Sequence, residues 1–261
     1  MKGNGRIIVF IAIIAVIVVF VILNMTVFTV QHITVLNKVE SQVIDKDEII
    51  KDSGIDLGSN IFLLSESKTI SSIEKQNPYV EVISIERSFP NKVLIHVSMR
   101  TPLMAVHIQN SNLYALIDAS LKILEIVDEY SALYLSSTKV IGIEITDPII
   151  GGVLYQTNDV NGRLAGIGYV AEKEKLEGSA FLNFFESVTF AGNEGSIIYI
   201  KVRSGVTICL NGINDTQSKL RFALEEYRAL GEQNFKRTQG FIYFNENLGW
   251  TWSENDPYKS E

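Results

Sequence analysis

The chain has 261 residues, enough for two ordinary domains that each bury a hydrophobic core. Its formal net charge of -7, with no cluster of Lys and Arg, argues against a nucleic-acid-binding surface. The single cysteine, Cys209, cannot form an intrachain disulfide, and its apolar neighbours predict a small buried side chain.

The amino-terminal region has the pattern of a membrane anchor. Residues 7–23 are all aliphatic, Ala or Phe, and as a helix the stretch 7–28 would extend roughly 30 Å, enough to cross a bilayer's hydrocarbon core. Because Lys2 and Arg6 precede this run, the positive-inside bias predicts a cytoplasmic tail at 1–6, a transmembrane helix at 7–27 and an extracytoplasmic remainder. A cleaved signal peptide is the alternative, although its apolar region is usually about 7–15 residues long and ends at a small-x-small site.

A small α+β domain is predicted at 28–100. Its first strand is expected at 28–35, where β-branched residues are frequent. Asp45 can cap a helix that ends near Gly54, and a second helix is expected at 66–76.

Two further strands follow within the same domain. They are expected on either side of a turn at 88–91, and a shift in the apolar alternation before Ile83 indicates a bulge. The predicted order is therefore strand, helix, helix, strand, strand, with the helices on one face of the sheet.

After Pro102 the pattern becomes mostly β, which predicts a second domain at 101–253. Strands are expected at 105–109, 113–118, 123–126, 196–202, 206–210, 240–244 and 248–252, and helices at 180–187 and from Asn214 or Asp215 to Gly231. The polar tail at 254–261 is expected to be disordered. The fold class is thus α+β, with one membrane helix, a small domain and a β-rich domain that contains a few helices.

The sequence lacks recognisable catalytic, cofactor-binding and metal-binding motifs. His32, His96 and His107 lie in separate predicted strands without an i, i+4 partner, so no zinc site is expected. Gly166-Ile-Gly168 lacks the third glycine of a dinucleotide-binding turn and is interpreted as a loop. We therefore expect no catalytic residue, cofactor, metal or small-molecule substrate.

The final predicted hairpin is the best candidate for an interaction site. If its last strand lies at a sheet edge, its unpaired backbone groups can accept a strand from another protein. Trp250 and Trp252 lie on one face of that strand. Tryptophan is frequent at interface hot spots, but both rings could equally close the core beneath the sheet.

Several motifs resemble the FtsQ/DivIB family of bacterial cell-division proteins. The resemblance lies in "FTVQHITVLNKVESQVIDKDEIIKDSGIDLGSNIFLL" and "NPYVEVISIERSFPNKVLIHVSMRTPLMAV", and continues into "SGVTICLNGINDTQSKLRFALEEYRAL" and "GFIYFNENLGWTWS". The motif of the family's POTRA domain matches Gly58 to Phe62, Pro78, Val80, Arg87, Phe89-Pro90 and Arg100-Thr101-Pro102. The chain departs from it at Met99, where an acid is usual, and at Leu36 and Leu121, where glycine is common.

The resemblance implies a non-enzymatic divisome scaffold, single-pass in the cell membrane and enriched at the division septum. Its implied partners are the membrane and the bitopic coiled-coil proteins that are FtsL-like and FtsB/DivIC-like, bound outside the membrane with no nucleic acid involved. The terminal strand of the β domain is implied to bind a partner by strand addition. The partner-binding residues carried over are Phe241, Tyr243, Leu248, Trp250 and Trp252.

Two other functions stay open from the residues alone. One is a membrane-anchored sensor that binds a small ligand in an apolar pocket between the two domains. The other is a cell-wall hydrolase, which requires two carboxylates placed around a cleft.

Overall fold

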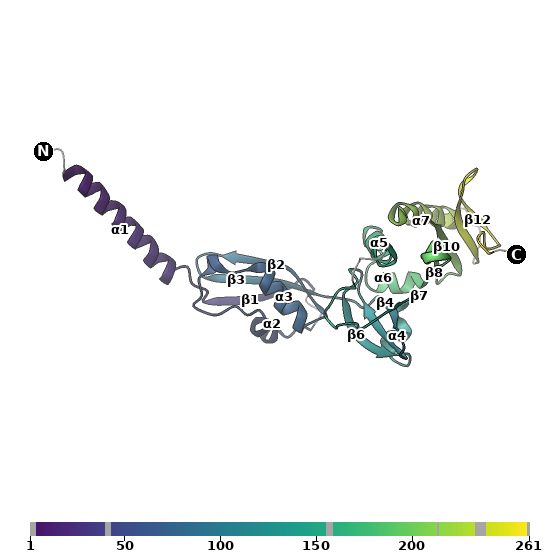
Figure 1. Cartoon of the computed structure of the whole chain (residues 1–261), viewed down its shortest axis with the longest axis horizontal. Helices are drawn as coiled ribbons and strands as arrows, with labels where there is room; N and C mark the ends of the chain where they lie inside the picture. The colour runs from purple at the N-terminus through teal and green to yellow at the C-terminus, as the bar shows by residue number, and fades with distance from the viewer. Residues whose placement is uncertain (1–3, 40–42, 155–158, 213, 233–238, 260–261) are drawn as a thin grey trace. The chain divides into compact units, whose positions relative to one another are not determined.

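The computed structural model describes residues 4–39, 43–154, 159–212, 214–232 and 239–259. The chain divides into two compact units, Met1–Arg100 and Thr101–Glu261. The first unit begins with helix α1 (Asn4–Thr26; Figure 1). From Ile7 to Leu23 every residue of this helix is apolar, so this part has no polar face.

The large apolar side chains of α1 are exposed along its middle, as Phe10 (65%) and Val16 (69%) illustrate. Over the described part of the chain, no helix reaches the combined length and hydropathy that crossing a bilayer requires. The transmembrane helix expected at 7–27 therefore stays a prediction.

The rest of the first unit is a three-stranded sheet with two helices. Its elements are β1 (His32–Asn37), α2 (Lys46–Asp52), the short 3-10 helix η1 (Ile61–Leu63), α3 (Glu66–Gln76), β2 (Val80–Ser88) and β3 (Lys92–Met99). The sheet order is β1-β3-β2, and the central β3 runs parallel to β1 and antiparallel to β2. Helices α2 and α3 cover one face of the sheet (Figure 1). Ile49 and Ile73 of these helices belong to the same buried core cluster as Val93, Ile95 and Val97 of β3. The predicted order of elements is confirmed.

Local signals account for the boundaries of these elements. Asp45 Oδ1 accepts hydrogen bonds from the backbone N–H groups of Asp47 (3.0 Å) and Glu48 (3.1 Å), which satisfies two free donors at the start of α2. The β2–β3 register shifts between Val82 and Ser84, where the alternation indicated a bulge. The N–H of Val82 donates to Glu74 Oε1 (3.0 Å), so a side chain occupies a backbone donor of edge strand β2.

The second unit is built on one nine-stranded sheet with strand order β12-β11-β10-β9-β8-β7-β4-β5-β6. Its elements are β4 (Met104–Ile108), β5 (Leu113–Ile117), β6 (Ile123–Asp128), α4 (Ala132–Ser136), β7 (Thr138–Ile145), α5 (Asp159–Lys173), α6 (Ser179–Phe184), β8 (Phe185–Ala191), the short 3-10 helix η2 (Asn193–Gly195), β9 (Ile197–Val202), β10 (Val206–Asn211), α7 (Thr216–Glu232), β11 (Gly240–Asn245) and β12 (Gly249–Ser253). Most neighbouring strands are antiparallel, but β4–β7, β7–β8 and β10–β11 are parallel. Because parallel neighbours need a crossover, α7 connects β10 to β11.

Helices cover the two faces of this sheet unequally. The main core lies under α5, α6 and α7, where Leu164, Phe181 and Leu220 are fully buried. On the opposite face a smaller cluster of Ala105, Leu116 and Val127 packs with Tyr134 of α4. The mixed α+β class, with a β-rich second unit, agrees with the sequence prediction.

The structure corrects two predictions in the second unit. The helix expected at 180–187 ends at Phe184, because Phe185 begins β8 and pairs with Val202 of β9. The motif Gly166-Ile-Gly168 lies in helix α5 and not in a loop. Gly168 allows the helix to approach another segment closely, since a Cβ there would lie 2.5 Å from the backbone oxygen of Ala119.

The carboxyl-terminal tail also differs from the prediction of disorder over its described part, 254–259. Asp256 Oδ1 accepts hydrogen bonds from the hydroxyl of Tyr199 on β9 (3.3 Å) and from the backbone N–H of Tyr258 (2.9 Å). The ring of Tyr258 lies 6.4 Å from that of Tyr243 on β11, edge to face. These contacts place the tail on the sheet face opposite α7.

Candidate partner-binding edge

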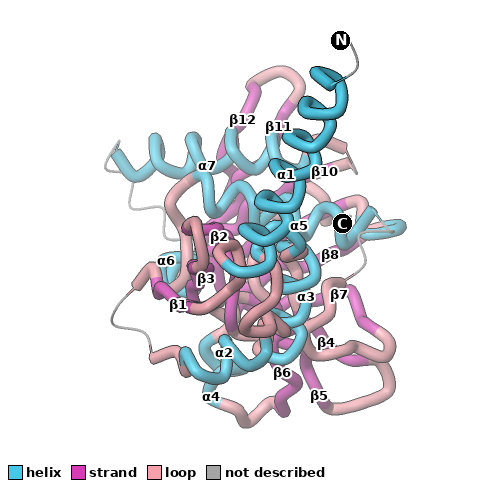
Figure 2. Tube along the Cα trace, turned by 90° about the vertical axis from the view of Figure 1, so that its left-hand side faces the viewer, coloured by secondary structure: helices cyan, strands magenta, loops and turns pink. Residues whose placement is uncertain are grey.

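Strand β12 forms one edge of the nine-stranded sheet. Among the described residues it pairs only with β11, and its register runs from Gly249 to Ser253 without a shift. Figure 2 shows β11 and β12 side by side, with α7 next to them. Natural edge strands are usually protected by Lys, Pro or a bulge. The sequence Gly-Trp-Thr-Trp-Ser has none of these, which makes β12 a candidate for accepting a strand from another protein.

Two other sheet edges are partly occupied by the chain itself. At the far end of the same sheet, the backbone N–H of Ile123 on β6 donates to Gly152 (2.8 Å), and its carbonyl accepts from Gly151 (2.8 Å). In the first unit, β2 carries the bulge and the Glu74 contact with Val82. These contacts occupy backbone groups of β2 and of the start of β6.

The tryptophans of β12 lie on the helix-covered face of the sheet. Trp252 is paired with Ile242, which is fully buried, and Trp250 with Phe244. Both indole rings pack against the main core while remaining partly exposed. The Nε1–H of Trp252 donates to the backbone oxygen of Gln239 (3.2 Å). The two readings of these residues, core closure and contact surface, are therefore compatible.

The other predicted partner-binding residues do not join the tryptophans. Phe241 and Tyr243 are paired with Ser253 and Thr251, so they point to the opposite face of the sheet. Leu248 lies in the turn of the hairpin and is 73% exposed. The five residues thus share one hairpin, but they divide between two faces and a turn.

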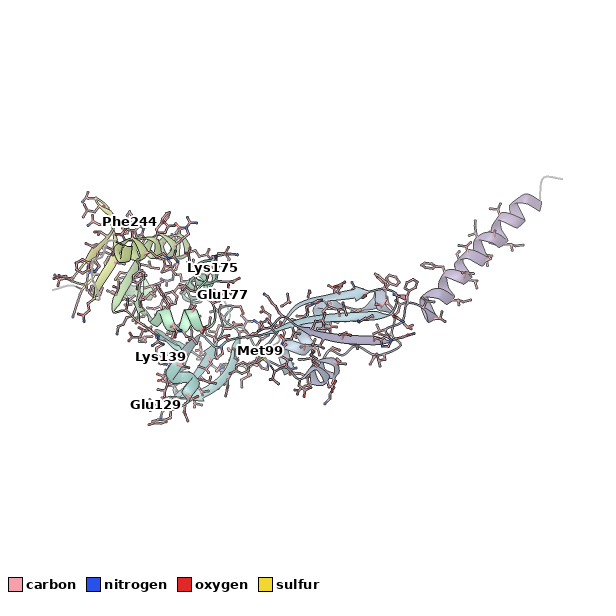
Figure 3. The ribbon with its side chains drawn as sticks, turned by 180° about the vertical axis from the view of Figure 1, so that it is seen from behind. Met99, Glu129, Lys139, Lys175, Glu177 and Phe244 are labelled. Carbon is pink, nitrogen blue, oxygen red and sulfur yellow. The ribbon has the colours of Figure 1, made fainter. Side chains whose placement is uncertain are left out.

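Phe244 belongs to the exposed surface of this hairpin and was not selected from the sequence. Phe244 is labelled in Figure 3. It is 54% exposed, and its ring lies 5.8 Å from that of Trp250. The turn that follows is fixed by Asn245, whose Oδ1 accepts from the N–H groups of Asn247 (2.9 Å) and Leu248 (3.2 Å). Recognising that turn would have fixed the register and placed Phe244 beside Trp250.

The opposite face of the hairpin is covered by the tail. Burial, with Asp256 nearby, raises the pKa of Tyr199 to about 12. Burial also raises the pKa of the Cys209 thiol, with Asp256 as a second cause. Cys209 is fully buried and remains a neutral thiol, so it lacks the thiolate that nucleophilic chemistry requires.

The comparisons with known proteins address both units. Residues 28–100 match the family model described as "POTRA domain, FtsQ-type". "Cell division protein DivIB" of Clostridium tetani is 28% identical over 129 residues, which are 49% of this chain and 47% of that protein. The protein of the same name in Clostridium acetobutylicum is 31% identical over 120 residues, 46% of each chain. Together these similarities support a relationship between the chain and the FtsQ/DivIB family. The chain covers about half the length of these two relatives.

The FtsQ/DivIB motif positions have clear structural roles in the first unit. Gly58 adopts a positive φ of 86°, and the side chain of Asn60 caps η1 by accepting from the N–H of Phe62 (2.9 Å). The guanidinium of Arg100 lies 3.0 Å from Glu74 Oε1, and its side chain is only 9% exposed. Buried pairs of this kind hold the end of β3 against α3.

The departures from the FtsQ/DivIB pattern are accommodated differently. Leu36 lies within β1 and is paired with His96 of β3. Leu121 lies in the turn between β5 and β6 with φ of 65°, the backbone region that glycine prefers. Its side chain is fully buried, so packing offsets the backbone strain.

The described residues of the chain contain no group of three His, Cys, Asp or Glu side chains that could hold a metal ion. The three histidines lie in β1, β3 and β4 as predicted, and His107 Nδ1 lies 2.9 Å from Glu144 Oε1. A hollow of about 640 Å³ lies within the first unit, between β1 and the end of α2, and is lined by Lys51, Asp56 and Lys92 among others.

Proposed function

We propose that this chain is a non-enzymatic scaffold of the bacterial division septum, which binds a partner by adding a strand to β12. The observation that carries the proposal is an edge strand without charge, proline or bulge, whose face is held in place by Trp250 and Trp252. Main-chain hydrogen bonds supply affinity in such complexes, while side chains beside the edge supply specificity. Phe244, Leu248 and Trp250 provide exposed apolar surface for that purpose.

The partners we propose are FtsL-like and FtsB/DivIC-like bitopic division proteins. The two Clostridium relatives are named as cell-division proteins, which supports a role in cell division. The FtsQ-type POTRA domain at 28–100 would serve recruitment to the septum. No nucleic acid, cofactor or small-molecule substrate is part of the proposal.

We also propose that residues 7–27 anchor the chain in the cell membrane, with the amino terminus in the cytoplasm. An apolar helix without a polar face is stable when protein or lipid surrounds it. The exposed Phe10 and Val16 of α1 therefore favour a lipid environment.

The strand-addition proposal is tested with a proline substitution in the edge. Thr251→Pro removes one backbone donor from β12 and obstructs the ladder. Loss of one or two hydrogen bonds, each contributing about 1 kcal/mol, should weaken binding of the extracytoplasmic partner segments roughly 5- to 30-fold. The matched control is Glu125→Pro in β6, an edge strand at the other end of the same sheet.

Both variants are checked for folding by circular dichroism, and binding is measured by calorimetry with the FtsL-like and DivIC-like segments of the same organism. Unchanged affinity in a folded Thr251→Pro variant would show that β12 is not the binding edge. Imaging of a fluorescent fusion tests the septal role separately. A midcell band is expected, and an even distribution along the cell would contradict it.

A further inference from the structure

Three phenylalanine rings form an exposed cluster on the first unit. The ring of Phe62 lies 5.2 Å from that of Phe28 and 5.2 Å from that of Phe89, and Phe28 and Phe89 are 6.3 Å apart. Phe62 is 50% exposed and Phe89 54%, and the adjoining Leu63 is 83% exposed. We call Phe28, Phe62, Leu63 and Phe89 the phenylalanine cluster. Single exposed apolar residues are ordinary, but contiguous groups mark interaction sites.

Contacts within the fold keep the side chains of the phenylalanine cluster exposed to solvent. Arg87 lies behind it and donates from Nε to the carbonyl of Ile61 (3.1 Å) and from Nη2 to that of Leu64 (2.8 Å). Arg87 also pairs with Glu66 (2.6 Å), while Ile61 is fully buried. Because both ends of η1 are fixed in this way, Phe62 and Leu63 cannot turn into the core. Their exposure is a property of the folded unit.

The cluster begins immediately after the apolar helix. Helix α1 ends at Thr26, and Phe28 is two residues further along the chain. Two residues span at most about 7 Å, so the rings lie near the end of α1 whatever the orientation of the helix. The intervening Val27 is itself 39% exposed. Apolar surface therefore continues from α1 through Val27 into the cluster.

We propose that the phenylalanine cluster lies in the interfacial layer of the membrane, on the extracytoplasmic side. The inference rests on the proposed anchor at 7–27, which would bring Phe28 to the level of the lipid headgroups. Phe and Leu side chains are favoured at the boundary between headgroups and acyl chains. The cluster would contact the membrane through three segments: the start of the unit, η1 and the β2–β3 turn. Contact at three segments would restrict the tilt of the unit on the membrane.

The experiment measures the depth of fluorescent labels on the full chain in phosphatidylcholine vesicles. An environment-sensitive dye is attached through Leu63→Cys in the cluster, through Ile14→Cys in α1, or through Gln76→Cys as a matched exposed control. Gln76 ends α3 near Val80, and the length of β2, about 26 Å, separates Val80 from the Ser88 end beside Phe89. Cys209 is fully buried, and the chain without added cysteines gives the background labelling.

Quenching is compared between lipids with a nitroxide near the headgroup and lipids with a nitroxide deep in the acyl chain. The Leu63 label should be quenched more strongly by the shallow nitroxide than by the deep one, and more than the Gln76 label by either. Adding Phe62→Ser and Phe89→Ser should reduce that quenching to the level of the Gln76 label, in a chain whose circular dichroism is unchanged.

The outcomes separate the cluster from the anchor. Strong quenching at Ile14 with equal quenching at Leu63 and Gln76 would leave the anchor in place and overturn the interfacial contact. No quenching at Ile14 would overturn the anchor, and the inference with it. Quenching at Leu63 that falls as the protein is diluted in lipid would identify a second copy of the chain as the occupant, which also overturns the proposal.

Discussion

At Leu121, in the turn between β5 and β6, the free-energy cost of a strained backbone can be compared with the stabilisation from a buried side chain. Leu121 is fully buried, but its φ of 65° lies in the left-handed region. That region costs a residue with a Cβ about 1–2 kcal/mol. The backbone there is fixed, because the N–H of Leu121 donates to Asp118 (3.1 Å) and its carbonyl accepts from Leu154 (3.0 Å). A substitution therefore cannot relieve the strain by moving the chain freely.

Two substitutions at this position separate the contributions. Leu121→Ala loses the buried side chain and keeps the strain, so it should destabilise the second unit by about 2–5 kcal/mol. Leu121→Gly loses the same packing but relieves the strain. In a strand, glycine is normally less stable than alanine by about 0.5–1 kcal/mol. At Leu121 the order should reverse, with Leu121→Gly more stable than Leu121→Ala by about 1 kcal/mol.

The assay is urea unfolding followed by tryptophan emission, since Trp250 and Trp252 are the two tryptophans of the chain and both lie in the second unit. The matched control is Leu116, another fully buried leucine, which lies within β5. There Leu116→Ala should be more stable than Leu116→Gly. The reasoning is refuted if Leu121→Ala is as stable as Leu121→Gly, or if both positions show the same order.

Three further predictions concern the second unit. Gly168→Ala should lower the free energy of unfolding by about 1–3 kcal/mol, because the new Cβ would clash with the backbone of Ala119. Gly162 lies in the same helix with open space around it, so Gly162→Ala should raise the free energy of unfolding by about 0.5–1 kcal/mol in the same urea assay. Burial, with Arg203 as a second cause, lowers the pKa of Lys139 to about 8 from 10.5, so the folded chain binds fewer protons than the unfolded one between these values. Stability contributed by this group should rise with pH across that window, and melting curves of Lys139→Met should lack this rise. Cys209 should react with a thiol reagent only after unfolding in urea, and equally rapid reaction in the native chain would contradict its burial.

The secondary structure of the first unit could be predicted from its sequence because the features that determine it involve residues close together in the chain. The cap at Asp45 and the stop after Gln76 fixed both helices, and the phase shift near Ile83 revealed the bulge. Each of these features depends on residues a few positions apart. Such short-range signals depend little on contacts with the rest of the chain.

The second unit was less readable because distant contacts overrule local preference. Helix α5 contains Gly166 and Gly168, which sequence rules assign to a loop, yet Gly168 is required where the helix meets Ala119. Similarly, Phe181 and Phe185 have helical spacing, but Phe185 is taken into the sheet by pairing with Val202. Tertiary packing decides both cases.

The candidate edge was partly predictable for the same reason. The final hairpin and the common face of Trp250 and Trp252 follow from strand alternation. The division of Phe241 and Tyr243 onto the other face follows only from the register. The position of β12 at the edge depends on the parallel pairing of β10 with β11, a long-range feature that no short motif encodes.

The attachment of Trp250 and Trp252 to the core has a consequence for the partner binding that we propose at β12. Because the indole rings are already packed, the strand is extended before any partner arrives. The loss of chain freedom on association then falls almost entirely on the incoming segment. Mutations that stiffen or loosen that segment should alter residence time far more than changes elsewhere in this chain.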